Sequence, residues 1–263
     1  MQNFPAFERI AGAGPLVLIC DHASSATPPS YGNLGLPQAA FARHIAYDIG
    51  AAGVTRRLAA LLGAPAVLST FSRLLIDPNR GADDPTLVMR ISDGAIVPGN
   101  ATVDAAETDA RIARFWRPYR EAIAAELRAV AAAGAVPVVV SVHTFTPVWR
   151  NVARPWQAGV LWDRDDRLAR PLIAALRADG LVCGDNEPYD GALKGDTMYD
   201  LCTAAGIAHA LVEIRQDLVS EEAGQAAWAE RLARLLGPLL ADPALGERRF
   251  FGSRADGRDG GFK

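Results

Sequence analysis

The sequence contains little that would direct the protein to a membrane, to nucleic acid or to an oxidising compartment. Its three cysteines among 263 residues are odd in number and widely spaced, which predicts reduced thiols rather than a disulfide framework. The longest apolar run, around residues 136–140, is far too short to cross a bilayer. The net charge is -3 and basic residues form no long stretch, which speaks against nucleic-acid binding. The first residues lack a basic segment followed by an apolar one, so we expect no secretory signal and a cytoplasmic location.

The chain is rich in apolar residues, enough to form a large hydrophobic core. Hydrophobic residues make up 50% of the chain, and no internal repeat or linker divides it. Strand-like and helix-like segments alternate, which predicts a single domain over residues 1–246, built as a three-layer α/β/α sandwich around a mixed, mostly parallel sheet. Residues 247–263 combine glycines with charges and are expected to form a flexible C-terminal tail.

The expected elements follow from hydrophobic periodicity and from glycine and proline punctuation. Residues 1–15 are a lead-in, and residues 81–103 form a long loop. Strands are predicted at residues 16–20, 66–69, 74–77, 137–143, 158–161, 182–183 and 210–215. Helices are predicted at residues 37–62, 105–133, 167–179, 197–205 and 220–240.

Four of the predicted strands run into polar, ionisable residues. His22 follows the first strand, Asn79 and Arg80 follow the strand at 74–77, His143 ends the most apolar strand, and Glu213 lies in the last one. A buried central strand has no intrinsic use for an imidazole or a carboxylate. Ligands of open α/β sheets bind beyond the carboxyl ends of the strands, so these side chains predict a site at that edge.

Two histidines at the ends of two strands can converge on a metal ion. Catalytic zinc sites commonly combine histidines with one carboxylate and leave a position for water. Asp48 is our candidate for that carboxylate, because it lies four residues after His44 on one face of a predicted helix. Asp21 is the alternative third ligand, and His44 is expected to be a solvated partner or a supporting group.

Glu213 stands in an apolar strand, two residues before Arg215 and therefore on the same side of the sheet. A buried carboxylate needs either a partner or a chemical task. Two roles are therefore open for Glu213. One is a structural ion pair with Arg215 or Arg73, and the other is that of a general base for water.

Guanidinium groups at the edge of a site bind carboxylates through two hydrogen bonds, which makes Arg80, with Asn79, a candidate for substrate binding. A loop-bracing role is the alternative for these residues. The turn-rich run at 185–189 includes Asn186, which could supply a further polar contact. Nucleophilic catalysis has no support, because the chain has no Gly-x-Ser-x-Gly elbow, and a His-Glu-x-x-His helix is also absent.

Six stretches of the sequence resemble the N-formylglutamate amidohydrolase family. They occur in order and together span about residues 15–235: Cys20-Asp21-His22-Ala23-Ser24, residues 44–50, residues 72–80, residues 141–147, residues 184–189 and Glu213-Ile214-Arg215-Gln216-Asp217-Leu218.

The resemblance implies a fold similar to that of zinc carboxypeptidases and aspartoacylase. It matches His22 and His143 to the two zinc histidines, Asn79 and Arg80 to the pair that holds a substrate carboxylate, and Glu213 to the catalytic glutamate. Two positions depart from the related patterns: Ser25 stands where carboxypeptidases have a glutamate ligand, and Cys202 stands about where the family often has a histidine.

We therefore expect a zinc-dependent amidohydrolase that acts on a small N-acylated amino acid of the N-formylglutamate type. Zinc is held by His22, Asp48 and His143. Glu213 carries protons, and Arg73 helps to polarise the acyl oxygen. Asn79, Arg80, Arg215 and Asn186 contact the substrate and its carboxylate. Two alternatives are a zinc peptidase or murein amidase of the same fold, and a metal-free carboxylate-binding protein, which Ser25 and Cys202 would permit.

Overall fold

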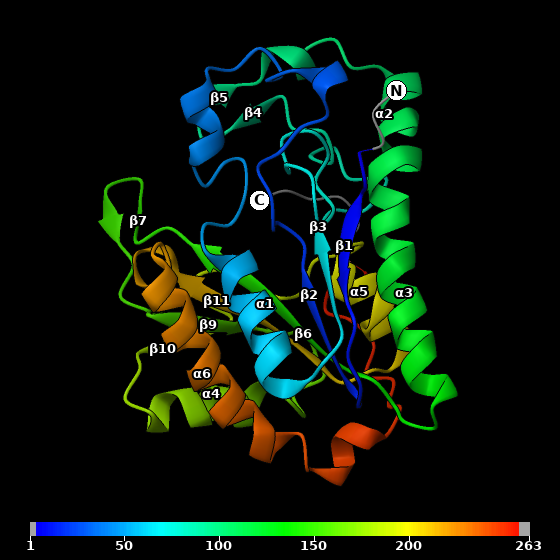
Figure 1. Ribbon diagram of the computed structural model, residues 1–263, viewed down its shortest axis with the longest axis vertical. Coiled ribbons are helices and arrows are strands. Elements are labelled where there is room, and N and C mark those ends of the chain that lie inside the picture. Colours follow the sequence, from blue (N-terminus) through cyan, green and yellow to red (C-terminus); the bar gives the residue numbers. More distant parts are fainter. Residues whose placement is uncertain (1–3, 258–263) are drawn as a thin grey trace.

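The computed structural model describes residues 4–257 and contains a sheet of seven strands in the order β1-β3-β2-β6-β11-β9-β10 (Figure 1). The pairs β3–β2, β2–β6, β6–β11 and β9–β10 are parallel, while β1–β3 and β11–β9 are antiparallel. The predicted mixed, mostly parallel sheet is thus confirmed. The strands are β1 (Phe7–Ile10), β2 (Leu16–Cys20), β3 (Ala66–Ser69), β6 (Val138–Phe145), β9 (Ala158–Leu161), β10 (Cys183–Asp185) and β11 (His209–Arg215). Two small hairpins, β4 (Ile91–Ser92) with β5 (Ala95–Ile96) and β7 (Val148–Trp149) with β8 (Val152–Ala153), lie outside this sheet.

Helices cover both faces of the sheet and complete the predicted three layers. The helices α1 (Ala51–Leu62), α4 (Ala169–Ala178) and α6 (Glu222–Leu239) pack on one face, and α3 (Arg117–Ala132) packs on the other (Figure 1). Shorter helices are α2 (Ala105–Arg111) and α5 (Thr197–Leu201), and a π-helical turn at Ile112–Trp116 joins α2 to α3. The 3₁₀ segments are Pro29–Tyr31, Gln38–Ala42, Pro98–Asn100, Thr203–Ala205, Gln216–Leu218 and Pro243–Gly246. No helix among the described residues is long and apolar enough to cross a membrane.

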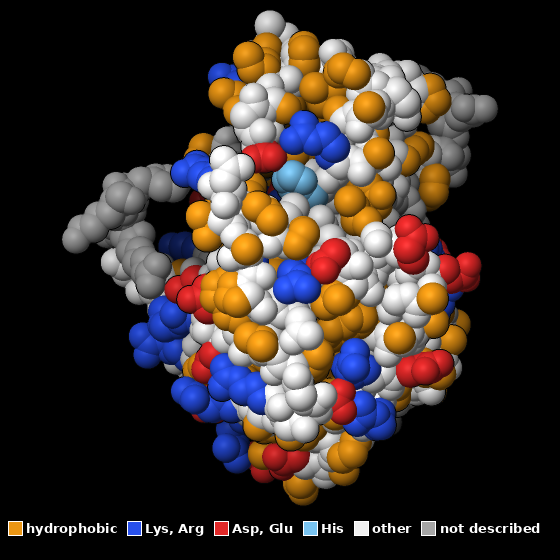
Figure 2. Space-filling model, turned by 90° about the vertical axis from the view of Figure 1, so that its left-hand side faces the viewer, with side chains coloured by type: hydrophobic (Ala, Val, Ile, Leu, Met, Phe, Trp, Pro, Cys, Tyr) orange, Lys and Arg blue, Asp and Glu red, His pale blue; other side chains and the backbone are white. Residues whose placement is uncertain are grey.

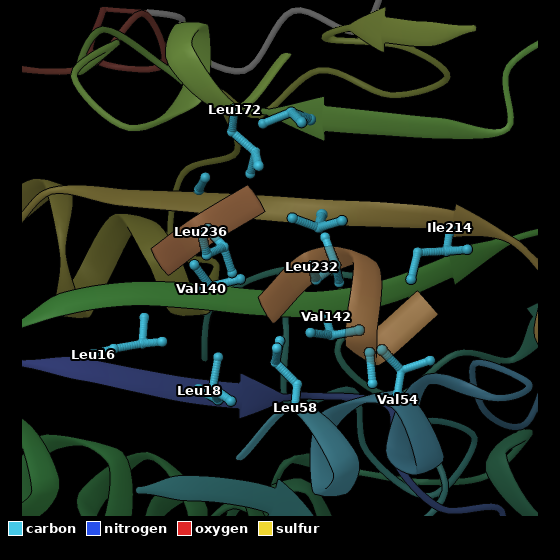
Figure 3. Close-up of a cluster of buried hydrophobic side chains, with 14 of the residues drawn as sticks. Leu16, Leu18, Val54, Leu58, Val140, Val142, Leu172, Ile214, Leu232 and Leu236 are labelled. Atoms are coloured by element: carbon cyan, nitrogen blue, oxygen red, sulfur yellow. The ribbon is translucent and has the colours of Figure 1, made fainter. Parts of the chain in front are cut away.

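The central strands are apolar along their whole length because both of their faces are covered. In β2, Leu16 and Leu18 pack with the helices α1 and α6, while Val17 and Ile19 point to the opposite face with α3. Figure 3 shows the first of these cores, in which side chains of β2, β6 and β11 meet α1, α4 and α6. The central strands are therefore packed on both faces up to their carboxyl ends.

The helix predicted at residues 37–62 is wrong in its first half, because only α1 and a 3₁₀ turn at Gln38–Ala42 form. Residues 43–50 instead form an irregular segment, whose backbone groups make hydrogen bonds to residues 22, 72 and 73. The Ala46 carbonyl accepts from the Arg73 N–H (3.2 Å) and from the Ser72 hydroxyl (2.8 Å), and the Asp48 N–H donates to the His22 carbonyl (3.0 Å). The α-helix begins only after Gly50, whose φ of 84° requires a left-handed conformation.

The strand predicted at residues 74–77 is also wrong, although every residue in it is buried. The segment is a turn, in which side chains replace the missing ladder bonds. Asn100 Nδ2 donates to the carbonyls of Leu74 and Met89, both at 2.8 Å, and an Arg111 Nη1 donates to the Leu75 carbonyl at 2.8 Å. Hydrophobicity alone cannot distinguish this buried turn from a strand.

Both ends of the described chain contact the rest of the domain. The lead-in contains β1, which takes the edge position beside β3. Residues 247–257, expected as part of a flexible tail, pack against the domain: the Arg249 N–H donates to the Gly206 carbonyl (2.9 Å), and Arg254 donates to the Trp162 carbonyl (2.8 Å). The remainder of that predicted tail lies outside the described residues. The three cysteines are free and buried.

Asn100 gives a direct test of the buried turn. Replacing it with Ala leaves the carbonyls of Leu74 and Met89 without their donor, so Asn100→Ala is expected to lower the free energy of unfolding by about 2–4 kcal/mol. The control is Asn33→Ala at an exposed asparagine, expected to change it by less than about 0.5 kcal/mol. Urea unfolding measures both, and equal effects of the two substitutions would contradict this role for Asn100.

Candidate active site

Three side chains of the predicted site come from neighbouring parallel strands. His22 follows β2 by two residues, His143 lies near the end of β6, and Glu213 of β11 stands directly opposite His143 in the strand register. Because β2, β6 and β11 run in the same direction, their carboxyl ends meet at one edge of the sheet. All three side chains are buried there.

His22, Asp48 and His143 form a compact group of potential metal ligands. One donor atom from each lies within 4.8 Å of the others. The Asp48 Oδ2 atom is 2.8 Å from His143 Nδ1 and 3.4 Å from His22 Nδ1. Ligand atoms of a tetrahedral zinc site with bonds of about 2.0–2.1 Å lie roughly 3.3 Å apart, so these three donors fit a zinc ion after small movements.

The other nitrogen of each imidazole is held by a second carboxylate. His22 Nε2 lies 2.7 Å from Asp77 Oδ1, and His143 Nε2 lies 3.0 Å from Asp21 Oδ2. An imidazole that donates its Nε2–H in this way presents Nδ1 as the metal-binding atom, and the carboxylate fixes its ring orientation. Asp21, the alternative third ligand in the sequence, therefore lies on the side of His143 that faces away from Asp48.

The ionisation of these groups favours a bound cation. Burial alone would raise the pKa of Asp77, but Arg73 and His22 outweigh it and hold that pKa well below its usual value. Burial likewise opposes ionisation of Asp48, yet His22 and His143 lower its pKa. Burial also disfavours the charged form of His143, but Asp21 and Asp48 raise its pKa well above the ordinary value. Asp48 and Asp77 are thus ionised, and their negative charges favour a cation bound near them.

Glu213 differs from these paired acids. Its Oε2 atom is buried and has no hydrogen-bond partner among residues 4–257. Burial is the largest influence on this group and raises its pKa to about 7. An unpaired buried carboxyl group that titrates near neutral pH is suited to taking up and releasing a proton. The ion pairs of Glu213 with Arg215 or Arg73 that the sequence left open do not form in the described chain.

A cavity of about 280 Å³ opens beside this group. Its volume suits a small molecule rather than a long polymer segment. Its walls come from the sheet, from the turn after residue 74 and from the segment that precedes and begins α5. The lining residues are His22, Asp48, Arg73, Asn79, Arg80, His143, Thr144, Leu161, Trp162, Tyr189, Asp190, Gly191, Leu193, Asp196, Met198, His209, Leu211 and Glu213.

The predicted arginines have different surroundings. Arg73 pairs with Asp77 at 2.9 Å and lies 3.6 Å from Asp48, so it is fixed beside the metal-ligand group. Arg80 lines the cavity and uses one Nη1–H on the carbonyl of Asn79 (2.9 Å). The Asn79 side chain accepts a hydrogen bond from the Thr197 N–H (3.1 Å), which joins the turn after residue 77 to the start of α5.

Two of the predicted substrate-binding residues, Arg215 and Asn186, lie outside the cavity. Arg215 pairs with Asp217 at 2.7 Å and does not line the cavity. The Asn186 side chain is occupied within its own loop, where its Oδ1 accepts from the N–H groups of Trp162 and Gly191, both at 3.0 Å. His44 is outside the metal-ligand group and lies 3.3 Å from Asp93.

Sequence reasoning missed several residues of the site. Asp77 was predicted only as the end of a strand, although it pairs with His22. Asp196, directly before α5, was not predicted to line the cavity. His209 lines the cavity, while Cys202 does not. A usable signal existed for His209, because it shares the two-residue spacing of Leu211 and Glu213 and therefore faces the same way from β11. Nothing local marked Asp77 as the partner of His22.

An α/β sandwich with buried histidines and carboxylates at the carboxyl edge of its parallel strands defines a candidate metal-binding enzyme. The family model for N-formylglutamate amidohydrolase matches residues 14–220. The chain belongs to this family.

Two solved structures have a similar fold. The gene product Atu2144 from Agrobacterium tumefaciens is 34% identical, with a TM-score of 0.86 over 90% of this chain and 95% of that one. N-formylglutamate amidohydrolase from Ralstonia eutropha JMP134 is 22% identical and shares the fold, with a TM-score of 0.61 over 89% of this chain and 96% of that one. No curated protein matches the sequence.

The carboxylates behind the histidines give a testable expectation. Asp21→Asn and Asp77→Asn keep a hydrogen-bond acceptor near each imidazole but remove its charge, so each is expected to weaken zinc binding by about 10–100-fold. Titration against a chromophoric chelator measures the affinity. Asp166→Asn, at a surface aspartate paired with Arg170, is the control and is expected to bind zinc as the unsubstituted protein does. Unchanged affinity in both buried variants would show that these carboxylates do not support the metal ligands.

Proposed function

We propose that the protein is a zinc-dependent hydrolase that cleaves the amide bond of a small N-acylated amino acid, of the N-formylglutamate type. One observation carries the proposal: the group of His22, Asp48 and His143 shares a small cavity with the unpaired carboxyl group of Glu213. Amide hydrolysis needs an activated water, a proton carrier and a site for the acyl oxygen. Membership of the family supports the reaction type.

His22, Asp48 and His143 would hold the zinc through two imidazole nitrogens and one carboxylate oxygen. When bound, the metal supplies a Lewis acid for the acyl oxygen and for water. The fit rests on the donor set and on the orientation of both imidazoles by Asp77 and Asp21. Asp48 provides the carboxylate that Ser25 cannot.

Glu213 takes a proton from the attacking water and passes it to the leaving nitrogen. Its pKa of about 7 and its lack of a partner fit a group that must accept and release a proton in one turnover. Arg73 lies beside Asp48 and its fixed positive charge stabilises the negative charge that develops on the acyl oxygen.

Arg80 binds the carboxylate of the substrate. Its guanidinium group lines the cavity and can offer two parallel N–H groups to a carboxylate. Asn79 holds Arg80 through its carbonyl and fixes the turn against α5. The substrate is thereby aligned with its acyl group at the metal and its carboxylate at Arg80.

The alternatives have less support. A cavity of about 280 Å³ suits a small substrate better than a long peptide or a murein strand. A metal-free binding protein would have no need for two buried carboxylates behind two histidines. Acidic and basic side chains are interspersed on the face seen in Figure 2, which fits a small-molecule substrate better than nucleic acid. The free cysteines are compatible with the predicted cytoplasmic location.

Two substitutions separate the metal ligand from the proton carrier. Asp48→Ala is expected to lose zinc and activity together. Glu213→Gln is expected to retain about one zinc per chain and to lower kcat by ~10²–10⁴-fold, the usual loss for a positioned proton carrier, with KM little changed. Elemental analysis and steady-state kinetics on N-formyl amino acids measure both quantities.

Each variant serves as the control for the other, since both remove a buried carboxylate from the same cavity. Zinc lost with Glu213→Gln and retained with Asp48→Ala would show that the two roles are exchanged. Hydrolysis by protein that contains no metal would overturn the zinc-dependent reaction itself.

A further inference from the structure

The backbone of Arg80 is held by side chains from α3 and from the π-helical turn before it. The Arg80 carbonyl accepts hydrogen bonds from Trp116 Nε1 (2.9 Å) and from Arg120 Nη2 (3.2 Å). The Arg80 N–H donates to the Asp77 carbonyl at 3.3 Å. The peptide groups on both sides of Arg80 are therefore bonded, which fixes the direction in which its side chain leaves the backbone.

Arg120 is buried and uses its guanidinium group on the turn that contains Arg80 and on the segment before α5. Its Nε and Nη2 atoms donate to the Pro78 carbonyl at 3.3 and 3.2 Å. Nη2 also donates to the Gly195 carbonyl at 2.8 Å. The guanidinium carbon lies 4.3 Å from the centre of the Trp116 ring, which is within the range of a cation–π contact. Arg120 and Trp116 thus orient each other as well as the turn.

The π-helical turn at Ile112–Trp116 places these donors on one side of the helix. In a regular α-helix, side chains five residues apart point roughly 140° apart. The hydrogen bond of the π turn spans five residues, so this turn takes up one extra residue. Trp116 therefore lies near the face of Arg111, which donates to the Leu75 carbonyl at 2.8 Å, and Arg120 follows one turn later. Side chains from both sides of the π turn thereby bind the same buried segment of the site.

The Arg80 guanidinium group keeps most of its donors for a ligand. It lines the cavity, and its Nη1 donates to the Asn79 carbonyl at 2.9 Å, the one hydrogen bond that this side chain makes within residues 4–257. This bond ties the guanidinium group to the turn, so a shift of the turn moves the group with it. A guanidinium fork binds a carboxylate through two parallel bonds only when it is aimed correctly. The contact with a substrate therefore depends on how accurately the turn is held.

We propose that Trp116 and Arg120 are positioning residues, which hold the backbone of Arg80 so that its guanidinium group is aimed at the substrate carboxylate. The inference rests on the proposed function, in which Arg80 binds that carboxylate. Neither Trp116 nor Arg120 is among the residues that line the cavity, so each acts through Arg80. Their loss weakens substrate binding and leaves the metal ligands and Glu213 in place.

Trp116→Phe removes the Nε1–H donor and keeps an aromatic ring on which Arg120 can stack. For hydrolysis of N-formylglutamate by the zinc-loaded variant, KM is expected to rise at least about fivefold and kcat to stay within about twofold, because only the aim of Arg80 is lost. Arg120→Lys keeps the positive charge but cannot bridge three carbonyls, so it is expected to raise KM at least about tenfold. Steady-state kinetics and zinc content measure both variants.

Combination with Arg80→Lys separates positioning from general support of the fold. The ammonium group of lysine is a compact charge on a flexible stem and needs no aimed fork. In the Arg80→Lys background, Trp116→Phe is therefore expected to change KM by less than about twofold. An effect of the same size in both backgrounds would show that Trp116 supports the structure in general, and the inference would be overturned.

Trp228→Phe is the matched control. Trp228 of α6 is buried and lies under Arg231, whose guanidinium carbon is 5.0 Å from the ring centre, but it packs on the opposite face of the sheet. This substitution is expected to leave KM and kcat unchanged, and a rise in KM equal to that of Trp116→Phe would contradict the inference. Normal hydrolysis with a KM that neither Trp116→Phe nor Arg120→Lys alters overturns the positioning role alone. If the zinc-loaded unsubstituted protein hydrolyses no N-formyl amino acid, the proposed function itself fails.

Discussion

The hydrogen bonds of the buried Asp21 carboxylate hold the segments of the site together. Its side chain, directly after β2, accepts hydrogen bonds from Thr197 (2.6 Å), His143 (3.0 Å), Ser141 (3.1 Å) and Tyr119 (3.2 Å). Thr197 belongs to α5, Ser141 and His143 to β6, and Tyr119 to α3. One carboxylate therefore connects the sheet to two helices. The same contacts set the ring of His143. A fully buried charge with four hydrogen-bond donors is stable where an unpaired one is not.

The electrostatic balance around Asp21 explains why so many acids tolerate burial. Asp21, Asp48 and Asp77 are ionised within one small volume, and Arg73 with a protonated His143 supplies the positive charge in the metal-free chain. A divalent cation held between the imidazoles would replace that proton and would balance the carboxylates. Binding of such a cation would then stabilise the folded form of this edge of the sheet, because the fold assembles its deprotonated ligands.

The sequence predicted the central strands well because burial on both faces leaves a continuous apolar run. Leu16–Cys20, Ala66–Ser69 and Ala158–Leu161 have the bounds expected of them. Residues 74–77 show the limit of that signal, since Asn100 and Arg111, distant in sequence, satisfy the backbone of a buried turn. β1 was missed because a short edge strand, only partly buried, carries little hydrophobic periodicity.

Sequence patterns placed side chains near the site but gave little information on their partners. The structure brings His22, Asp48 and His143 together as expected, although Asp48 arrives on an irregular segment and not on a helix. Arg215 shares a side of β11 with Glu213, as its spacing predicts, because Val212 and Ile214 face the core on the other side. It nevertheless pairs with Asp217 and does not line the cavity. Asp77 pairs with His22 across 55 positions of sequence, a contact that no local pattern encodes.

We propose that the fold presents Nδ1 of two histidines and one oxygen of Asp48 to a single zinc ion. X-ray diffraction from crystals of the zinc-loaded protein, with anomalous data collected at the zinc absorption edge, locates the ion. We expect one strong anomalous peak about 2.0–2.2 Å from His22 Nδ1, His143 Nδ1 and an Asp48 carboxylate oxygen. Zinc bound through Nε2 of either histidine, or a principal peak away from Asp48, would contradict it.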